Sequence, residues 1–236
     1  MKILLYHITP AVNSVFFWNI GKLLERIHLF DKIFIAVAVG ESISTAEGTV
    51  PLMPLEYVRS LFQHIPNVTF GQFNNDSSHR ESVSFEWLMK QAAHWPDATT
   101  FYAHSKGLTR GNNTAVRLWT EAMYDHLLAP TYLPKVEQYL EKYPIVGCFK
   151  RCRRSADQWP DFPKESNYHF SGTFWWFRNV DMFSRPWREN IRLGRYEVEA
   201  YPSMIFDRSE AGCPFADHAG NPFDLRYLQR LGLLDS

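Results

Sequence analysis

The first half of the chain alternates between short apolar runs and segments with helical spacing. Apolar runs predict four strands, over residues 2–7, 32–39, 68–73 and 99–103. The run over 32–39 is continuous and rich in β-branched residues, which is typical of a strand buried on both faces. Strands that alternate with helices predict the α/β class, with a mostly parallel central sheet, right-handed crossovers and helices on its faces.

Three helices are predicted between these strands, because apolar residues recur three and four positions apart. Asn13 or Ser14 can cap the first, and its expected apolar face is Phe17, Ile20, Leu24 and Ile27. The second covers residues 55–65. The third begins at Ser82 or Ser84, and its apolar residues are Phe85, Leu88, Met89 and Ala92.

The second half is less regular. Helices are predicted over residues 115–128, 133–143 and 199–206, and strands over 145–149 and 169–177. The stretch 150–167 is polar and basic without periodicity, so we expect a long functional loop there. No repeat, low-complexity tract or clear linker divides the sequence, which favours a single domain over residues 1–236.

Composition narrows the function classes. The 25 basic residues balance 25 acidic ones, which argues against a protein that grips nucleic acid through a generally basic surface. The three cysteines are too few for a disulfide framework and lack the spacing of zinc sites, and free thiols suit a reducing compartment. No apolar run approaches the ~20 residues of a membrane span, and the first run is too short for a signal peptide. We therefore expect a cytoplasmic protein without a membrane span.

Ligands of open parallel sheets bind beyond the carboxyl ends of the strands. This rule selects four polar or glycine-bearing segments, over residues 6–9, 39–41, 74–76 and 104–107. In the first of them, Tyr6, His7 and Thr9 are the candidate binding residues. Turns are polar at most strand ends, so each of the first three segments, taken alone, is better explained as an ordinary turn.

The segment His104-Ser105-Lys106-Gly107 is the strongest of the four, because it directly follows a buried apolar strand. Lys106 offers a mobile positive charge, and His104 can donate a hydrogen bond or ligate a metal. Gly107 allows a turn or a close approach of the backbone to a ligand. Together these residues suit a phosphate group.

Another polar group, which includes Asp76, Arg80 and Glu81, lies just before the third helix. An arginine there could hold a phosphate with the help of the helix N-terminus. Asp76 and Ser82 are equally typical of turn and cap residues. The sequence lacks Gly-x-Gly-x-x-Gly after the first strand, Gly-x4-Gly-Lys-Ser/Thr and Gly-x-Ser-x-Gly. The common dinucleotide, P-loop and α/β-hydrolase interpretations are therefore disfavoured.

In the second half, Ser171 and Gly172 precede the aromatic pair Trp175 and Trp176. A Ser-Gly pair can let a ligand reach the backbone, and aromatic faces can support sugar rings, although tryptophans in strands most often pack in the core. The glutamates Glu197 and Glu199 are the best general-base candidates of the chain. Acidic residues are also favoured at the start of a helix.

Taken together, these motifs resemble nucleotide-sugar glycosyltransferases of the GT-A type. The similarity is greatest to the rhamnan-synthesis F-like group and its relatives in bacteria and large viruses. The matching segments span nearly the whole chain in the order of that group: residues 75–81, 102–107, 117–119, 171–176 and 196–199. The resemblance implies a GT-A-like, Rossmann-like fold, with a nucleotide-binding half over 1–107 and an acceptor and catalytic half over 108–236.

The resemblance also implies an activity, the transfer of a sugar from an NDP-sugar donor to a glycan or other hydroxyl acceptor, with inversion by single displacement. Glu199 is the expected base and Glu197 the reserve. Donor binding is expected from Tyr6, His7, Thr9, Asp76, Arg80, Glu81, His104, Ser105, Lys106 and Gly107. The acceptor and sugar side is expected from Ser171, Gly172, Trp175 and Trp176.

The sequence departs from the group at two points. Glu81 stands where the group often has Asp. The Asp-x-Asp that binds metal in many GT-A enzymes is missing, because His104-Ser105-Lys106 occupies that strand end. Mg²⁺ or Mn²⁺ is a candidate cofactor, but hard cations prefer carboxylates and no ligand set is assigned. Two alternatives stay open, a non-catalytic carbohydrate-binding module and a nucleotidyltransferase.

Overall fold

The structure is a computed structural model that describes residues 1–155, 158–217 and 220–234. Its strands are β1 (Lys2–Ile8), β2 (Lys32–Val39), β3 (Ser42–Thr45), β4 (Gly48–Pro51), β5 (Val68–Asn74), β6 (Thr99–His104), β7 (Ile145–Gly147), β8 (Lys150–Cys152), β9 (Tyr168–Phe170), β10 (Trp175–Arg178) and β11 (Ala211–Gly212). Its helices are α1 (Ser14–Leu24), α2 (Leu55–Leu61), α3 (Ser82–Ala93), α4 (Thr114–Leu128), α5 (Leu133–Lys142), α6 (Asn179–Phe183), α7 (Glu197–Ile205) and α8 (Leu225–Arg230). Short 3₁₀ turns include η2 (Leu108–Arg110) and η4 (Arg208–Glu210).

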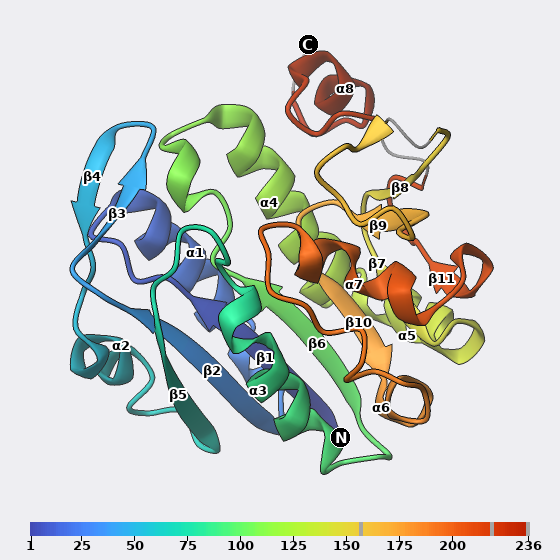
Figure 1. Ribbon diagram of the computed structural model, residues 1–236, viewed down its shortest axis with the longest axis horizontal. Coiled ribbons are helices and arrows are strands. Elements are labelled where there is room, and N and C mark those ends of the chain that lie inside the picture. The colour runs from blue at the N-terminus through green and yellow to red at the C-terminus, as the bar shows by residue number, and fades with distance from the viewer. Residues whose placement is uncertain (156–157, 218–219, 235–236) are drawn as a thin grey trace.

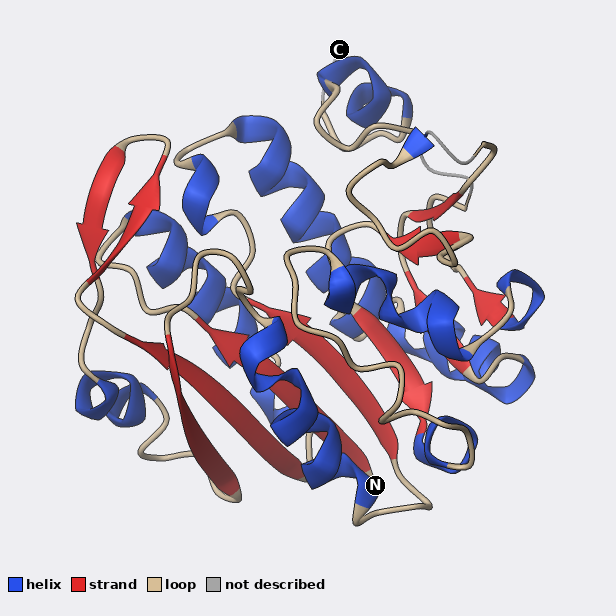
Figure 2. Cartoon of the chain, viewed as in Figure 1, coloured by secondary structure: helices blue, strands red, loops and turns tan. Residues whose placement is uncertain are grey.

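A seven-stranded sheet in the order β11-β7-β10-β6-β1-β2-β5 organises the chain (Figures 1 and 2). The pairs β1–β2, β1–β6, β2–β5 and β7–β11 are parallel, and β10 runs antiparallel to both of its neighbours. The predicted α/β class is confirmed, with a mostly parallel sheet, helices on its faces and a single domain. The division into a nucleotide-binding half and an acceptor half stays a prediction.

The order of the strands sets the place for a ligand. From β1 the chain builds outward through β2 to β5, and then returns to the other side of β1 with β6. The change of direction between β1 and β6 is a topological switch point, where open α/β sheets bind their ligands. His7 and His104 are partners across this strand pair. Two of the predicted site segments are therefore neighbours at the carboxyl edge.

Apolar side chains cover both faces of the sheet, because its central strands alternate between two cores. Leu4, Tyr6 and Ile8 of β1 belong to the core with α1, α2, α4 and α5, whereas Ile3 and Leu5 belong to the core with α3, α6 and α7. Helix α3 lies across the front of the sheet in Figure 1. Its four predicted apolar residues, Phe85, Leu88, Met89 and Ala92, are all buried as expected.

The predicted apolar face of α1 is partly wrong. Phe17 is 45 % exposed, while Phe16 and Leu23 are fully buried next to the correctly predicted Ile20. The N-cap is Asn13, whose Oδ1 accepts the N–H of Phe16. The buried face of α1 is therefore rotated by about one residue from the predicted face. The predicted and the observed apolar residues both have helical spacing, so only tertiary packing determines which set is buried.

The single strand predicted over 169–177 is two strands. Gly172 and Thr173 have left-handed backbones, with φ of +97° and +64°, which end the extended run between β9 and β10. Strand β9 pairs with β8, whereas β10 joins the main sheet. The expected loop over 150–167 begins with strand β8, and its residues 156 and 157 lie outside the described part of the chain.

The sequence prediction missed the hairpin of β3 and β4 and the small elements α6, α8 and β11. These segments have two to six residues each, so they are too short for a periodic signal. Among the described residues, we find no helix with the length and apolar character that a bilayer crossing requires.

Trp175 and Trp176 need the main correction, because both are core residues. Trp176 is 1 % exposed, lies 5.1 Å from the ring of Phe101 and donates its Nε1–H to the carbonyl oxygen of Leu127 at 3.0 Å. Trp175 is fully buried on the opposite face and stacks on Tyr102 at 5.1 Å. Adjacent residues of a strand point to opposite faces, so the pair joins both cores and cannot form one sugar platform.

We predict that Trp176→Ala lowers the free energy of unfolding by about 3–5 kcal/mol, the usual cost of truncating a buried aromatic side chain. The matched control is Phe17→Ala, which we expect to change stability by less than about 1 kcal/mol, because Phe17 is exposed. Urea denaturation measures both variants. Equal stability of Trp176→Ala and the wild type would contradict the core assignment.

Candidate functional site

A cavity of about 450 Å³ lies at the carboxyl ends of β1 and β6. It is lined by most of the residues that the sequence singled out. These are His7, Thr9, Asp76, Arg80, Glu81, His104, Ser105, Lys106, Gly107, Ser171 and Glu199. The fold therefore brings together five segments that lie far apart in the sequence.

The other five predicted site residues do not line this cavity. Tyr6 is fully buried and its hydroxyl hydrogen-bonds that of Tyr124 at 2.8 Å, so it is a core residue like Trp175 and Trp176. Gly172 contributes only its backbone, through an N–H that donates to Oε1 of Glu199. Glu197 is not among the residues that line the cavity. Burial raises the pKa of its carboxyl, and the charge of Arg192 opposes that rise.

The sequence prediction missed much of the wall. The missed polar residues include Arg110, Arg151, His169 and Arg195, and the missed aromatic residues are Trp159, Phe162 and Phe223. Trp119 and Tyr196 also line the cavity; they belong to segments that match the family, but the sequence analysis gave them no role. Most come from irregular segments or from the ends of short strands and helices, where no periodicity marks a face. The missed hairpin adds Ile43 and Ser44 to the wall, and its Ala46 N–H donates to the Thr109 carbonyl at 3.0 Å.

Two strand ends are tied together at the base of the cavity. The backbone N–H of Thr9 donates to Ser105 Oγ at 3.0 Å, and the N–H of Ser105 donates to the carbonyl oxygen of His7 at the same distance. Gly107 then takes φ of +84°, and a Cβ there would meet Val116 Cγ1 at 2.8 Å. The strand end thus turns sharply, which leaves Lys106 at the cavity wall with its Nζ 4.8 Å from the Trp119 ring centroid.

Three histidines of the cavity are neutral at ordinary pH because they are desolvated. Burial lowers the pKa of His7 to about 4, and that of His104 to about 3 with Lys106 adding to the effect. Burial also lowers the pKa of His169 to about 4, while Glu199 opposes this shift. His104 can therefore contact a phosphate through a hydrogen bond but adds no positive charge, since its imidazole is neutral.

Asp76 and Arg80 differ in role. Asp76 Oδ1 accepts the backbone N–H groups of Ser78 and His79, and its Oδ2 lies 2.7 Å from His79 Nδ1. Asp76 therefore builds the turn before α3. Arg80 is half-buried with a left-handed backbone, φ of +53°, and burial lowers the pKa of its guanidinium, with Arg195 and Arg110 adding to that effect. The charge of Glu81 opposes the shift of the Arg80 pKa. Arginines that converge on a half-buried guanidinium are typical of a binding site for an anion.

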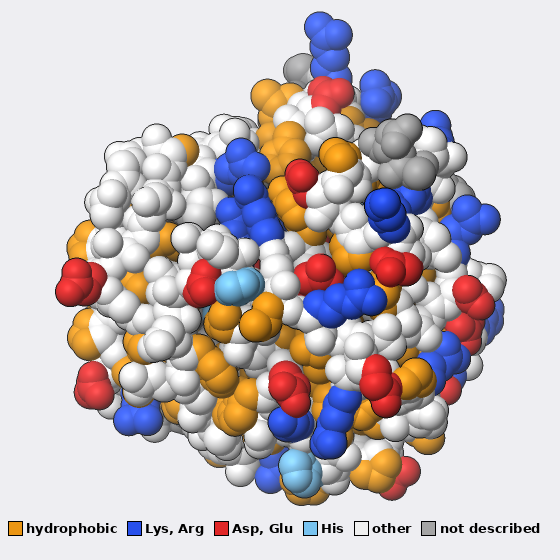
Figure 3. All heavy atoms as spheres, viewed as in Figure 1, with side chains coloured by type: hydrophobic (Ala, Val, Ile, Leu, Met, Phe, Trp, Pro, Cys, Tyr) orange, Lys and Arg blue, Asp and Glu red, His pale blue; other side chains and the backbone are white. Residues whose placement is uncertain are grey.

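The charged wall of the cavity has an excess of positive side chains. Within the part of the chain that the structure describes, the lining has five cations, Arg80, Lys106, Arg110, Arg151 and Arg195, against three acids, Asp76, Glu81 and Glu199. In Figure 3, Lys and Arg side chains gather on the upper middle of the visible face, between the hairpin and α8 of Figure 1. The field of this cavity therefore favours anionic ligands.

Glu199 is the carboxylate best placed for chemistry. It lies in the first turn of α7, its side chain is 16 % exposed, and its Oε1 accepts the Gly172 N–H at 3.3 Å. The same oxygen lies 3.8 Å from His169 Nε2, which hydrogen-bonds Ser171 Oγ at 3.1 Å. The carboxylate is thus fixed by one backbone donor and retains free acceptor positions.

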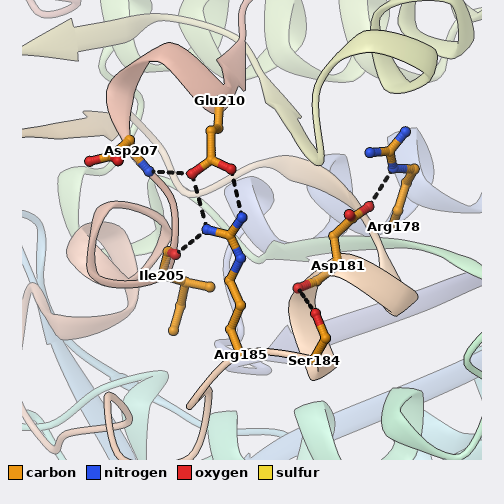
Figure 4. A network of polar contacts seen from close by, with 7 residues as sticks. All are labelled: Arg178, Asp181, Ser184, Arg185, Ile205, Asp207 and Glu210. Carbon is orange, nitrogen blue, oxygen red and sulfur yellow. Dashed lines mark hydrogen bonds and ion pairs between the residues drawn. The ribbon is translucent and has the colours of Figure 1, made fainter.

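The helix that carries Glu199 is held at its other end by an arginine (Figure 4). Arg185 donates from Nη1 to the carbonyl oxygen of Ile205 at 2.7 Å, and it pairs with both carboxylate oxygens of Glu210, at 2.6 and 3.0 Å. Glu210 also accepts the N–H of Asp207 at 2.9 Å. The contact with the Ile205 carbonyl oxygen fixes the C-terminal end of α7, and the bidentate pair joins Arg185 to the turn η4 that follows the helix.

The cavity does not offer a ligand set for a resident metal. Among the described residues, no group of three or more His, Cys, Asp or Glu side chains lies close enough to hold an ion. Two carboxylates of the lining already accept hydrogen bonds from the backbone. Asp76 accepts the N–H of Ser78 in its own turn, and Glu199 accepts the N–H of Gly172. The positive charge of the described lining therefore comes from its lysine and arginine side chains.

Comparison with known proteins gives structural matches only. No family model and no curated protein matches the chain. One similar solved structure is a 4-diphosphocytidyl-2C-methyl-D-erythritol synthase, 9 % identical, with a TM-score of 0.44 and 99 % of each chain covered. Another is glucosyl-3-phosphoglycerate synthase from Mycobacterium tuberculosis in complex with Mn²⁺, UDP-glucose and phosphoglyceric acid. It is 14 % identical, with a TM-score of 0.42, and covers 100 % of this chain and 81 % of that chain. The resemblance to the rhamnan-synthesis F-like group is not confirmed by a family model.

We predict that the protein loses stability as the pH falls from 7 to 5. The folded-state pKa values of His7, His104 and His169, about 4, 3 and 4, lie below the ordinary value of 6.5, so the unfolded chain binds protons in this range that the folded chain does not. Each histidine contributes up to about 1.4 kcal/mol per pH unit. Urea unfolding at pH 7, 6 and 5 measures the loss of unfolding free energy. In His104→Gln this loss per pH unit should be smaller, because about one proton fewer is taken up on unfolding. A stability independent of pH in this range would contradict buried neutral histidines.

Proposed function

We propose that this protein is a glycosyltransferase that moves a sugar from an NDP-sugar donor to a hydroxyl acceptor. The observation that carries the proposal is the convergence of five cationic side chains and the fixed carboxylate of Glu199 on one cavity at the switch point of the sheet. A diphosphate leaving group needs the first feature, and deprotonation of an acceptor hydroxyl needs the second.

The donor diphosphate would lie against Lys106 and Arg80. Lys106 is a point charge that can follow the leaving group, and Arg80 offers a planar fork that suits two phosphate oxygens. Arg110 and Arg195 add two further cations to the lining, and the charge of each lowers the pKa of Arg80. As the bond between the anomeric carbon and the diphosphate breaks, these charges stabilise the developing negative charge.

The acceptor would enter from the side of α7. Glu199 would accept the proton of the attacking hydroxyl while its other contact, the Gly172 N–H, keeps the carboxylate in place. A single displacement with one base inverts the anomeric carbon. Neutral His104 and His169 would act as hydrogen-bonding groups around the sugar, because neither carries a charge at neutral pH.

The two alternatives make different demands on the same cavity. Nucleotidyl transfer normally uses metal-binding carboxylates at a strand end, and the described residues provide no such group. A non-catalytic carbohydrate-binding module has no need for a cluster of cations, and it would bind glycan independently of nucleotide. A thermal-shift panel of nucleoside diphosphates, with and without Mn²⁺, tests the proposal and separates it from both.

We predict that Lys106→Ala weakens nucleoside diphosphate binding and reduces turnover of the NDP-sugar by tenfold or more, because a contact to the leaving group is lost. The thermal stability should change little, since Lys106 lies on a loop. The exposed Lys142 of α5 gives a matched control, and Lys142→Ala should behave as the wild type. A normal turnover with a lowered melting temperature would make Lys106 a structural residue.

We predict that Glu199→Gln reduces turnover by roughly 10² to 10⁴, the usual contribution of a positioned base, while donor affinity is nearly intact. The amide oxygen can still accept the Gly172 N–H, so the fold is preserved. Glu197→Gln, measured for binding and turnover in parallel, is the matched control from the same turn of α7. If both variants turn over normally, the base is not in this segment.

A further inference from the structure

Two arginines flank the ring of Trp159 on the acceptor side of the cavity, and their surroundings differ. The guanidinium of Arg153 lies 5.3 Å from the ring centroid and donates to three backbone carbonyl oxygens, those of Trp159, Pro163 and Lys164. The guanidinium of Arg151 lies 5.7 Å from the same ring, and it makes no hydrogen bond or ion pair with any described residue. Arg153 therefore fastens its loop, whereas Arg151 retains its full set of donors for another partner.

Arg151 lines the cavity from strand β8 and is half-buried there. A desolvated guanidinium without a partner is unfavourable, and burial lowers its pKa while the charge of Glu199 opposes that shift. Charge-assisted pairing of such a group with an oxyanion is among the strongest polar contacts in proteins. The guanidinium of Arg151 can thus bind an anion, because it makes no hydrogen bond or ion pair with the described turns and loops around it.

A chain of side-chain contacts connects Arg151 to Glu199, so an anion bound to Arg151 would lie on the Glu199 side of the cavity. The Arg151 guanidinium lies over the Trp159 ring, which contacts the ring of His169, and His169 Nε2 lies 3.8 Å from Glu199 Oε1. Lys106, at the end of β6, lies instead over the ring of Trp119. Around Arg151 the wall is aromatic. Trp159 lies 4.3 Å from the ring of His169, and Phe162 stacks on Tyr196 at 4.9 Å with an interplanar angle of 20°. Flat apolar faces beside a guanidinium that has no polar partner among the described residues suit a sugar ring that carries a negative group.

We propose that the acceptor is an anionic sugar, with a phosphate or carboxylate near the hydroxyl that receives the transferred sugar, and that Arg151 binds this oxyanion. The inference rests on the proposed function, since it divides the same cavity into a donor part at Arg80 and Lys106 and an acceptor part at Arg151. A phosphate and a carboxylate present the same pair of oxygens to the guanidinium, so the experiment tests both.

Isothermal titration of the protein saturated with its best nucleoside diphosphate tests the proposal. The probes are inorganic phosphate, glucose 6-phosphate, glucuronate and the neutral methyl glucoside. At least one anionic probe should bind with saturation and at least tenfold more tightly than the neutral glycoside. Arg151→Gln should weaken that binding tenfold or more, and the phosphate and carboxylate probes show which oxyanion is preferred. The matched control is Arg154→Gln, an exposed arginine of the same segment outside the cavity lining, which should behave as the wild type.

Two results would overturn the proposal. One is that no anionic probe binds more tightly than the neutral glycoside, or that Arg151→Gln binds it as the wild type does. The other is that Arg151→Gln weakens the nucleoside diphosphate itself tenfold, which would make Arg151 part of the donor site. If no nucleoside diphosphate binds, the proposed function fails separately. The same titration on the free protein then decides the role of Arg151 by the same tenfold criterion.

Discussion

The pairing of β1 with β6 is the constraint on which the site depends. Strand β6 returns to the side of β1 opposite β2, so the carboxyl ends of two central strands meet where the chain changes direction. The contacts between Thr9, Ser105 and His7 tie these ends together. Because both strands are buried on both faces, the strand ends have little freedom, and the groups that follow them occupy fixed positions.

Burial then determines which groups of the cavity carry charge. The cost of desolvation keeps His7, His104 and His169 neutral, while lysine and arginine retain their protons because their ordinary pKa values are much higher. The cavity therefore combines permanent cations with neutral hydrogen-bonding groups. Under the proposed function, such an arrangement would stabilise an anionic leaving group without a competing change of protonation, and Glu199 would accept the proton of the acceptor hydroxyl.

The sequence predicted the parts of the site that follow regular strands. Buried strands of six to eight residues have a continuous apolar pattern, so their carboxyl ends, and with them His7 and Lys106, could be located. Arg151, Trp159 and Arg195 could not, because short or irregular segments supply them and only tertiary structure brings them to the cavity. The tryptophans of β10 were misassigned for a related reason. An aromatic run in the sequence is compatible with a core strand and with a sugar-binding surface. Because successive side chains of a strand point to opposite faces, neighbouring tryptophans enter different cores once both faces of the sheet are covered.

The central claim is that the cavity between β6 and α7 binds an NDP-sugar, and amide hydrogen exchange measured with and without the donor tests it most directly. Bound donor should slow exchange at residues 104–110 and 193–199, which frame the cavity, and leave helix α5 on the far edge of the sheet unchanged. Unchanged exchange in both cavity segments, or protection confined to α5, would contradict the account.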